Sequence, residues 1–197
     1  MADAIARGGL VLGLLAGGRA RRLGGLDKAW LQREGQPQVL RLARALAGDV
    51  DHVLVSANRD LARYAAHGLA AVPDRVADAG PIGALDALAA ACRAPWLLTL
   101  PVDVVEVPGG LLQALASGRA ANGARLHDGH GPQPLVALWR TGALRDAVAT
   151  ALAAREHAVH ALQARLGMAE VRLDGVRLGN LNTPGDLRAA GVQVEEP

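Results

Sequence analysis

Short apolar runs, each followed by a polar or glycine-rich loop, constrain the fold of this 197-residue chain more than any other feature. The runs at residues 10–15, 53–55, 69–72 and 96–100 lack the alternation of apolar and polar residues that a half-exposed strand shows. Such strands are buried on both faces, and the segments between them have the residue spacing of helices. The sequence therefore predicts an α/β fold with a mostly parallel sheet covered by helices on both faces.

The expected helices have local start and stop signals. Pro37 suits the first turn of a helix that ends near Gly48, and Thr183 with Pro184 predicts the N-cap and first residue of a terminal helix. The other expected helices span residues 60–66, 82–94, 111–117, 144–154 and 159–166, further strands span 124–127, 135–139 and 171–173, a loop spans 128–134, and the tail 192–197 is expected to be frayed.

The composition excludes several classes of protein. The arginines are spread along a chain of formal net charge +2 that has no Phe and few other aromatic residues, which argues against nucleic-acid binding. The single cysteine, Cys92, excludes an internal disulfide and a CxxC metal cluster, and we expect it to be a buried structural residue in a helix. The sequence shows neither a signal peptide nor an apolar run that could cross a bilayer, so we expect a cytoplasmic protein with no membrane partner.

The strongest chemical signal is the loop from Leu15 to Lys28, which follows the first strand. Gly17 and Gly18 allow backbone N–H groups to approach a phosphate, and Arg22 and its neighbours add positive charge. Lys28 is the only lysine among 21 basic residues, and its compact ammonium suits the crowded oxygens of a polyphosphate. Ligands of open α/β sheets bind at the carboxyl ends of the strands, so the pattern predicts a phosphate-binding loop. The alternative is a mobile loop without a ligand.

Polar residues also follow the later strands. Asp103 comes directly after the strand at residues 96–100, where a carboxylate could hold Mg²⁺ against phosphate oxygens or merely cap a turn. The histidines at 127, 130, 157 and 160 match no familiar metal-binding spacing and are assigned to solvated loops or helix faces. The loops after the second and third strands add candidates for contact with a base, a ribose or a phosphate, namely Ser56, Asn58, Asp74, Gly80 and Pro81.

Two sequence patterns resemble a known family. Leu15 to Lys28 fits LAGG-x-x-x-R-[LM]-G-G-x-D-K, and Asn180 to Pro184 is similar to N-[VI]-N-T-P. Together with Ala57-Asn58-Arg59, Pro101-x-Asp103, His127-Asp128-Gly129 and Gln133-Pro134-Leu135, they make nearly the whole chain resemble the molybdenum cofactor guanylyltransferases, which belong to the nucleotidyltransferase superfamily.

This resemblance implies a fold, a reaction and a set of ligands. The fold would be a single Rossmann-like three-layer nucleotidyltransferase domain over residues 1–197, of the nucleotide-diphospho-sugar transferase type, with about 9–105 binding the nucleotide and about 106–190 the acceptor. The reaction would transfer GMP from Mg-GTP to the phosphate of molybdenum-bearing molybdopterin, giving the guanine dinucleotide cofactor and pyrophosphate. GTP, molybdopterin and Mg²⁺ are the implied ligands, and proteins of molybdenum insertion and molybdoenzyme maturation are candidate partners.

The resemblance also implies roles for individual residues. Lys28 and Arg22 would neutralise phosphate charge and Asp103 would hold Mg²⁺, which makes these three the candidate catalytic residues. Asn180 and Asn182 would lie on the acceptor side or near the metal. The nucleotide would be bound by Leu15, Ala16, Gly17, Gly18, Lys28, Ser56, Asn58, Asp74, Gly80, Pro81 and Asp103.

Two departures from the family pattern bear on the substrate. Ser56 stands where the family usually has Asn, so one contact with the base or ribose would be shortened or lost. Val105 stands where the family usually has Pro, so a less rigid turn is expected after Asp103. These departures leave open a related transferase that uses CTP or another phosphorylated acceptor, and a catalytically weak GTP-binding partner in cofactor delivery.

Overall fold

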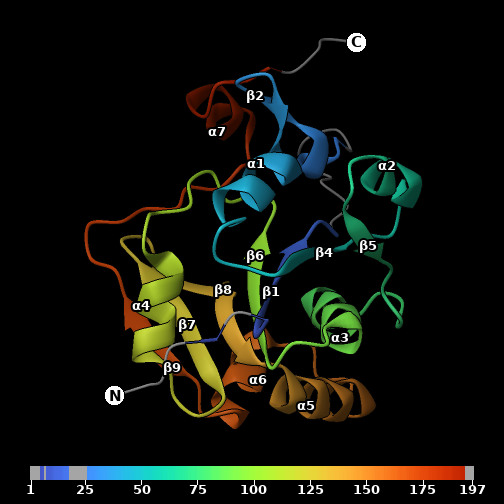
Figure 1. Cartoon of the computed structure of the whole chain (residues 1–197), viewed down its shortest axis with the longest axis vertical. Coiled ribbons are helices and arrows are strands. Elements are labelled where there is room, and N and C mark those ends of the chain that lie inside the picture. Colours follow the sequence, from blue (N-terminus) through green and yellow to red (C-terminus); the bar gives the residue numbers. More distant parts are fainter. Residues whose placement is uncertain (1–4, 7, 18–25, 194–197) are drawn as a thin grey trace.

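The central element of the computed structural model, which describes residues 5–6, 8–17 and 26–193, is a seven-stranded sheet (Figure 1). Its strands are β1 (Leu10–Leu15), β4 (His52–Ser56), β5 (Ala70–Val72), β6 (Trp96–Pro101), β7 (Gly123–Asp128), β8 (Gly131–Arg140) and β9 (Ala169–Arg172). They lie in the order β5-β4-β1-β6-β8-β7-β9, and every neighbouring pair is parallel except those that involve β8. The mostly parallel sheet predicted from the apolar runs is confirmed.

Helices cover both faces of this sheet (Figure 1). Successive side chains of a strand point to opposite faces, and β1 accordingly contributes Leu12 and Leu14 to one core and Val11 to the other, all fully buried. The first core includes α1 (Gln38–Ala45), α2 (Leu61–Ala66) and α4 (Leu111–Gly118), and the second includes α3 (Pro81–Ala91), α5 (Thr141–Ala153) and α6 (Val159–Arg165). The three layers expected from the sequence are therefore present.

A second, three-stranded sheet lies above the central sheet in the view of Figure 1, next to α7 (Pro184–Ala189). It consists of β2 (Gln32–Arg33), β3 (Gln36–Pro37) and β10 (Val192–Gln193), paired antiparallel in the order β10-β2-β3. The expectation of a frayed tail was wrong at Val192 and Gln193, because these residues pair with β2 and the side chain of Val192 is buried against a small apolar cluster.

Several predicted helix bounds shift in the structure. Pro37 belongs to β3, and α1 begins one residue later, at Gln38. Helix α3 ends at Ala91, so Cys92 follows the helix instead of lying inside it, but it is fully buried as expected. Thr183 was correctly predicted as the N-cap of α7, where its hydroxyl accepts a hydrogen bond from the backbone N–H of Asp186.

Strands β7 and β8 form a tight hairpin where the sequence predicted a loop over residues 128–134. Asp128 ends β7 and is buried, and Gly131 already begins β8. The loop prediction was wrong at Asp128 and over residues 131–134, where β8 contains Pro132 and Pro134 although proline usually interrupts a sheet. Strand β8 pairs with β6 only over residues 137–140, so both prolines lie in the part of β8 that has left β6.

Gly123, the first residue of β7, is expected to be indispensable for stability. Its φ is +133°, and an added Cβ would lie 2.0 Å from the carbonyl oxygen of Leu138. We expect Gly123→Ala to lower the free energy of unfolding by about 2–4 kcal/mol, measured by urea denaturation, because it adds backbone strain to a clash with main-chain atoms. Gly131→Ala is the control, since Gly131 also has a positive φ, +118°, but faces open space. Equal stability of the two variants would contradict this expectation.

Candidate active site

Three predicted site residues from distant parts of the sequence meet beyond the end of β6. The Nζ atom of Lys28 donates a hydrogen bond of 2.6 Å to Oδ1 of Asn182 and another of 3.2 Å to Oδ2 of Asp103. The side chains of Lys28 and Asp103 are 19% and 24% exposed, so a ligand can reach them while the protein shields them partly from water. Partial shielding strengthens the interaction of these charges with each other and with a bound phosphate.

Buried neighbours fix the position of Lys28. The residue begins a short 3-10 helix, η2 (Lys28–Trp30), in which Ala29 and Trp30 are buried. The carboxylate of Asp27 caps this helix by accepting a hydrogen bond of 3.0 Å from the N–H of Ala29. The ammonium therefore stands on an anchored turn.

Asp103 and Asn182 are brought together by two paired backbone segments. The N–H of Leu181 donates to the carbonyl of Asp103 at 2.8 Å, and the N–H of Val105 donates to the carbonyl of Gly179 at 3.2 Å. Asn180 lies opposite Val104 in an isolated β-bridge. Proline has no N–H and could not make the bond of Val105. The turn after Asp103 is thus held by hydrogen bonds.

A second cluster of predicted residues lies at the ends of β4 and β5. The hydroxyl of Ser56 donates to Oδ1 of Asp74 at 3.2 Å, and Nδ2 of Asn58 donates to Oδ2 of the same carboxylate at 2.9 Å. The N–H of Asp74 in turn donates to Oδ1 of Asn58 at 2.8 Å. Ser56 is buried and Asn58 is exposed, so the cluster joins the sheet to a polar surface suited to hydrogen-bonding a nucleoside.

The Gly-Pro turn holds the loop of Asp74 against α3. Gly80 has a φ of +58° and directly precedes α3, where Pro81 takes the first helical position. A Cβ on Gly83 would lie 3.3 Å from the carbonyl oxygen of Val76 and 3.6 Å from Cγ of Asp74, which shows how closely the loop approaches the helix. The first turn of α3 therefore supports the second cluster.

The first strand ends beside this second cluster. The N–H of Ala16 donates to the carbonyl of Ser56 at 2.9 Å, Leu15 is buried and Gly17 is exposed. Gly18 and Arg22, which the sequence also predicts at the site, lie outside the described residues. The structure thus brings the start of the loop next to Ser56 and its end, Lys28, next to Asp103.

Comparison with known proteins identifies the family of this chain. Residues 13–170 match the family of MobA-like NTP transferase domains. The chain belongs to this family. It is 40% identical over 171 residues to a molybdenum cofactor guanylyltransferase of Burkholderia vietnamiensis (80% of this chain, 83% of the relative), and 36% identical over 189 residues to one of Ralstonia nicotianae (89% and 92%). A crystal structure of molybdopterin-guanine dinucleotide biosynthesis protein A from Archaeoglobus fulgidus superposes with a TM-score of 0.67, at 18% identity over 92% of this chain and 96% of that one.

The family assignment confirms the resemblance and the fold predicted from the sequence. This member of the MobA-like NTP transferase family is a nucleotidyltransferase with the α/β architecture of that class, and its relatives place it in molybdopterin guanine dinucleotide synthesis. The family match ends at residue 170, so Asn180 and Asn182 lie beyond it.

Three residues at this site of the family member were missed as functional candidates. Arg33 and Gln38 donate to the carbonyls of Val105 and Val104 at 2.7 and 2.6 Å, although no sequence motif distinguishes them. Asp128 accepts a hydrogen bond of 3.0 Å from the N–H of Leu178, in the segment that leads to Asn180 and Asn182. The sequence places Asp128 in the predicted loop over residues 128–134 and in the His-Asp-Gly pattern of the family resemblance, without a role of its own.

The ionisation of Asp128 makes the free energy of unfolding depend on pH in the acid range. Burial alone would raise the pKa of Asp128, but hydrogen bonds from the backbone of Leu178 and His130 and from the side chain of Gln133 outweigh it and hold the pKa below its usual value. The unfolded chain then takes up a proton at a higher pH than the folded protein. The stabilisation is therefore complete above about pH 4 and is lost as the pH falls through the folded-state pKa.

Asp128→Asn tests this link between pH and stability. We expect the variant to be less stable than the parent by about 1–2 kcal/mol at pH 7, because the hydrogen bonds lose their charged acceptor. The difference should shrink as the pH is lowered below about 4, where the unfolded chain takes up its proton, and should be smallest below the folded-state pKa, where the folded carboxyl is neutral too. Urea denaturation of both proteins at pH 7 and at stepwise lower pH measures it, and a difference that stays constant with pH would contradict the assignment.

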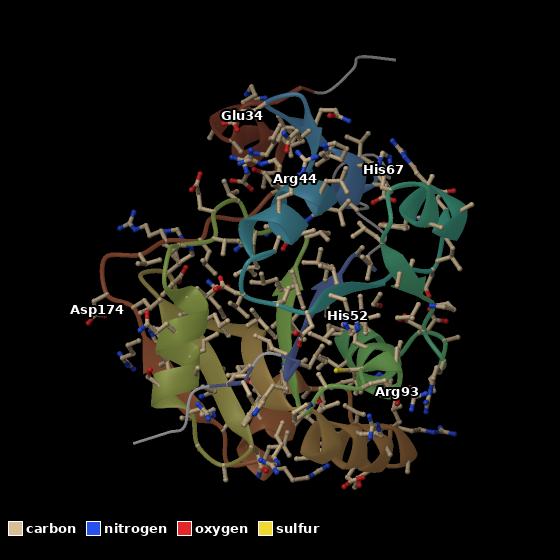
Figure 2. All side chains as sticks on the ribbon, viewed as in Figure 1. Glu34, Arg44, His52, His67, Arg93 and Asp174 are labelled. Atoms are coloured by element: carbon tan, nitrogen blue, oxygen red, sulfur yellow. The ribbon has the colours of Figure 1, made fainter. Side chains whose placement is uncertain are left out.

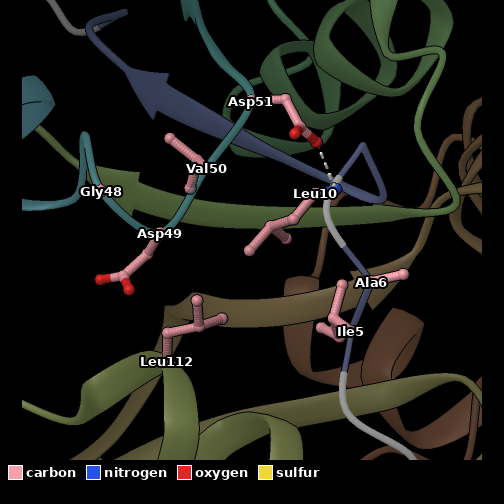
Figure 3. Close-up of a pocket in the computed structure, with 8 residues that line it drawn as sticks. All are labelled: Ile5, Ala6, Leu10, Gly48, Asp49, Val50, Asp51 and Leu112. Atoms are coloured by element: carbon pink, nitrogen blue, oxygen red, sulfur yellow. Dashed lines mark hydrogen bonds between the residues drawn. The ribbon is translucent and has the colours of Figure 1, made fainter.

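The cavity nearest the start of the chain lies at the opposite edge of the sheet. It has a volume of about 240 Å³ and is lined by residues such as Leu10, Asp51 and Leu112, at the amino-terminal ends of the strands (Figure 3). Asp51 is occupied there in accepting hydrogen bonds from Gly8 and Leu10. Within residues 5–6, 8–17 and 26–193, no three His, Cys, Asp or Glu side chains gather closely enough to hold a metal, and none of the helices in those ranges could span a membrane.

Proposed function

We propose that this protein transfers GMP from GTP to the terminal phosphate of molybdenum-bearing molybdopterin, producing molybdopterin guanine dinucleotide and pyrophosphate. The observation that carries the proposal is the meeting of Lys28, Asp103 and Asn182 beyond the carboxyl edge of a parallel sheet. Nucleotides bind at this edge in doubly wound folds, and the names of the relatives supply the acceptor.

In the proposed reaction, a phosphate oxygen of the acceptor attacks the α-phosphorus of GTP, and the bond from that phosphorus to the departing pyrophosphate breaks. Lys28 neutralises charge that moves from the triphosphate into pyrophosphate, with Arg22 as a further cation of the same loop. Catalysis of this kind rests on positioning and electrostatic stabilisation and needs no covalent enzyme intermediate. Lys28, Asp103 and Asn182, which hydrogen bonds hold together, provide groups for positioning and for electrostatic stabilisation.

We assign the two ends of the loop from Leu15 to Lys28 to different parts of GTP. Lys28, at its end, would contact the phosphates that leave as pyrophosphate. The backbone of Leu15 to Gly18 and the Ser56, Asn58 and Asp74 cluster would bind the nucleoside and its nearest phosphate, with Gly80 and Pro81 in support. Asn180 and Asn182 would contact the acceptor. In this scheme residues of about 9–105 bind the nucleotide and about 106–190 the acceptor, within one domain over residues 1–197.

The residues at this site fit a Mg²⁺ ion whose remaining ligands come from the substrate and from water. Magnesium in phosphate-transfer sites is commonly held by one or two carboxylates together with substrate phosphates and water. Asp103 provides the carboxylate, and among the described residues its Oδ1 atom receives no hydrogen bond, while Oδ2 faces Lys28. When bound, the ion would supply additional positive charge against the phosphate oxygens.

A nucleotide-selectivity assay tests the proposal. The protein is incubated with Mg²⁺, molybdenum-loaded molybdopterin and GTP, CTP or ATP in separate reactions, and pyrophosphate is measured. We expect release with GTP alone, and only when the acceptor is present. Release with CTP alone would replace the guanylyl assignment by a cytidylyl one, and tight GTP binding without release would indicate a binding partner in cofactor delivery.

A further inference from the structure

Arg33 links the backbone segments that carry the reactive residues. Its Nη1 atom donates to the carbonyl of Val105 at 2.7 Å, and its Nε atom donates to the carbonyl of Ala190 at 3.0 Å. Val105 lies two residues after Asp103, and Ala190 is the C-cap of α7, whose N-cap, Thr183, directly follows Asn182. One guanidinium therefore joins the turn of Asp103 to the helix that follows Asn182.

The link is buried and has additional support. The side chain of Arg33 is only 6% exposed, so its two hydrogen bonds are shielded from competition with water. Gln38, which is fully buried, donates to the carbonyl of Val104 at 2.6 Å. Leu31 packs with Leu181 in the same small apolar cluster, between η2 and the Asn182 segment. Leu31, Arg33 and Gln38 all follow Lys28 within a short stretch of chain. The segment that carries the ammonium therefore also binds the backbone segments of Asp103 and Asn182.

We propose that Arg33 is a positioning residue that holds Asp103 and Asn182 in register with Lys28. Arg33 touches none of the reacting groups and acts through the backbone of Val105 and Ala190. A charged, forked donor suits this role because it binds two carbonyls at once in fixed directions, which an ammonium cannot do. The catalytic part of this inference rests on the proposed nucleotidyl transfer, and its structural part stands independently.

Hydrogen exchange gives the structural test. In Arg33→Met, the amides of Val105 and Leu181, which bond to Gly179 and Asp103, should exchange about tenfold faster, because the segments they connect lose their outer support. The amides of β1 should exchange as before. Unchanged exchange at Val105 and Leu181 would overturn the proposal, and so would equal acceleration throughout the chain, since that indicates a general loss of stability.

Kinetics give the catalytic test. Arg33→Met should lower kcat for pyrophosphate release about 10- to 100-fold and leave the KM for GTP within about twofold, because a small displacement of Asp103 harms the transition state more than ground-state binding. Arg33→Lys should lie between parent and Arg33→Met in both tests, and it carries them if Arg33→Met does not fold. A parental kcat in both variants would overturn the catalytic role.

Arg93→Met is the matched control. Arg93 is exposed between α3 and the amino-terminal end of β6 (Figure 2), whereas the paired segments lie beyond the other end of β6, so its loss should change neither exchange nor kcat. Equal losses in Arg93→Met and Arg33→Met would show a general effect of charge and overturn the proposal. If the parent protein releases no pyrophosphate with any nucleotide, the proposed function fails, and the exchange test still decides whether Arg33 holds the two segments.

Discussion

Replacing Lys28 with alanine is expected to lower kcat for pyrophosphate release by about 10²–10³-fold, the cost typical of removing one preorganised electrostatic group. The ammonium lies 3.2 Å from Asp103 and 2.6 Å from Asn182, so the protein has already fixed it before a substrate binds. The KM for GTP should rise less than kcat falls, because charge on the departing pyrophosphate develops only as the bond breaks. Steady-state kinetics with GTP and the molybdopterin acceptor measure both quantities.

Lys28→Arg separates charge from geometry. Arginine keeps the positive charge but presents a planar fork in place of a compact ammonium, so we expect it to restore only part of the lost kcat. Full activity in Lys28→Arg would show that charge alone suffices, and full activity in Lys28→Ala would remove Lys28 from the mechanism.

The composition allows an independent test of whether Lys28 contacts the phosphates of GTP. Because the chain has a single lysine, an amine-reactive reagent can modify only its side chain and the α-amino group at the N-terminus. Mg-GTP should protect Lys28 and leave the α-amino group reactive, which peptide mass spectrometry can resolve. Equal labelling with and without Mg-GTP would contradict a phosphate contact.

Replacing Asp103 with asparagine should produce a loss of similar size or greater, about 10³-fold in kcat, with a higher Mg²⁺ concentration needed for half-maximal rate. Asparagine keeps the size of the side chain and leaves the carbonyl that accepts from Leu181 in place, so only the carboxylate charge is removed. Titration of Mg²⁺ in the pyrophosphate assay measures the change in requirement.

Asp49→Asn is the control for this substitution. Asp49 is an exposed aspartate that lines the cavity at the opposite edge of the sheet, so its loss should alter neither kcat nor the Mg²⁺ requirement (Figure 3). If Asp103→Asn behaved like Asp49→Asn, the metal would have to be held elsewhere.

Strands of the central sheet were predictable where the sequence contains an uninterrupted apolar run. The run Leu10 to Leu15 is apolar throughout, and the structure buries every residue of it between two helical layers. The candidate site was predictable for a similar reason, since the carboxyl ends of parallel strands meet at one edge and polar residues follow several of them. The proximity of Ser56 to Asp74 follows from this rule.

The other features of the fold and of the candidate site depend on contacts that no local sequence pattern encodes. Strands β2 and β3 have two residues each, too few for a periodic signal, and β10 is recognisable only through its pairing with β2. Arg33 is one arginine among many in the sequence, and only its burial against two carbonyls distinguishes it. Asp128 looked like a loop residue because its partner, Leu178, lies 50 residues further along the chain.

The contact between Lys28 and Asn182 spans 154 residues, and this separation affects how the protein is made. A nascent chain that has emerged from the ribosome as far as residue 170 contains the whole family-matched region, yet it lacks the segment that pairs with Asp103. Contacts between distant residues form slowly because closing the long intervening loop costs conformational entropy. Competence for the proposed transfer should therefore appear only when residues 178–192 have been synthesised and docked, and a shorter nascent chain should be inactive.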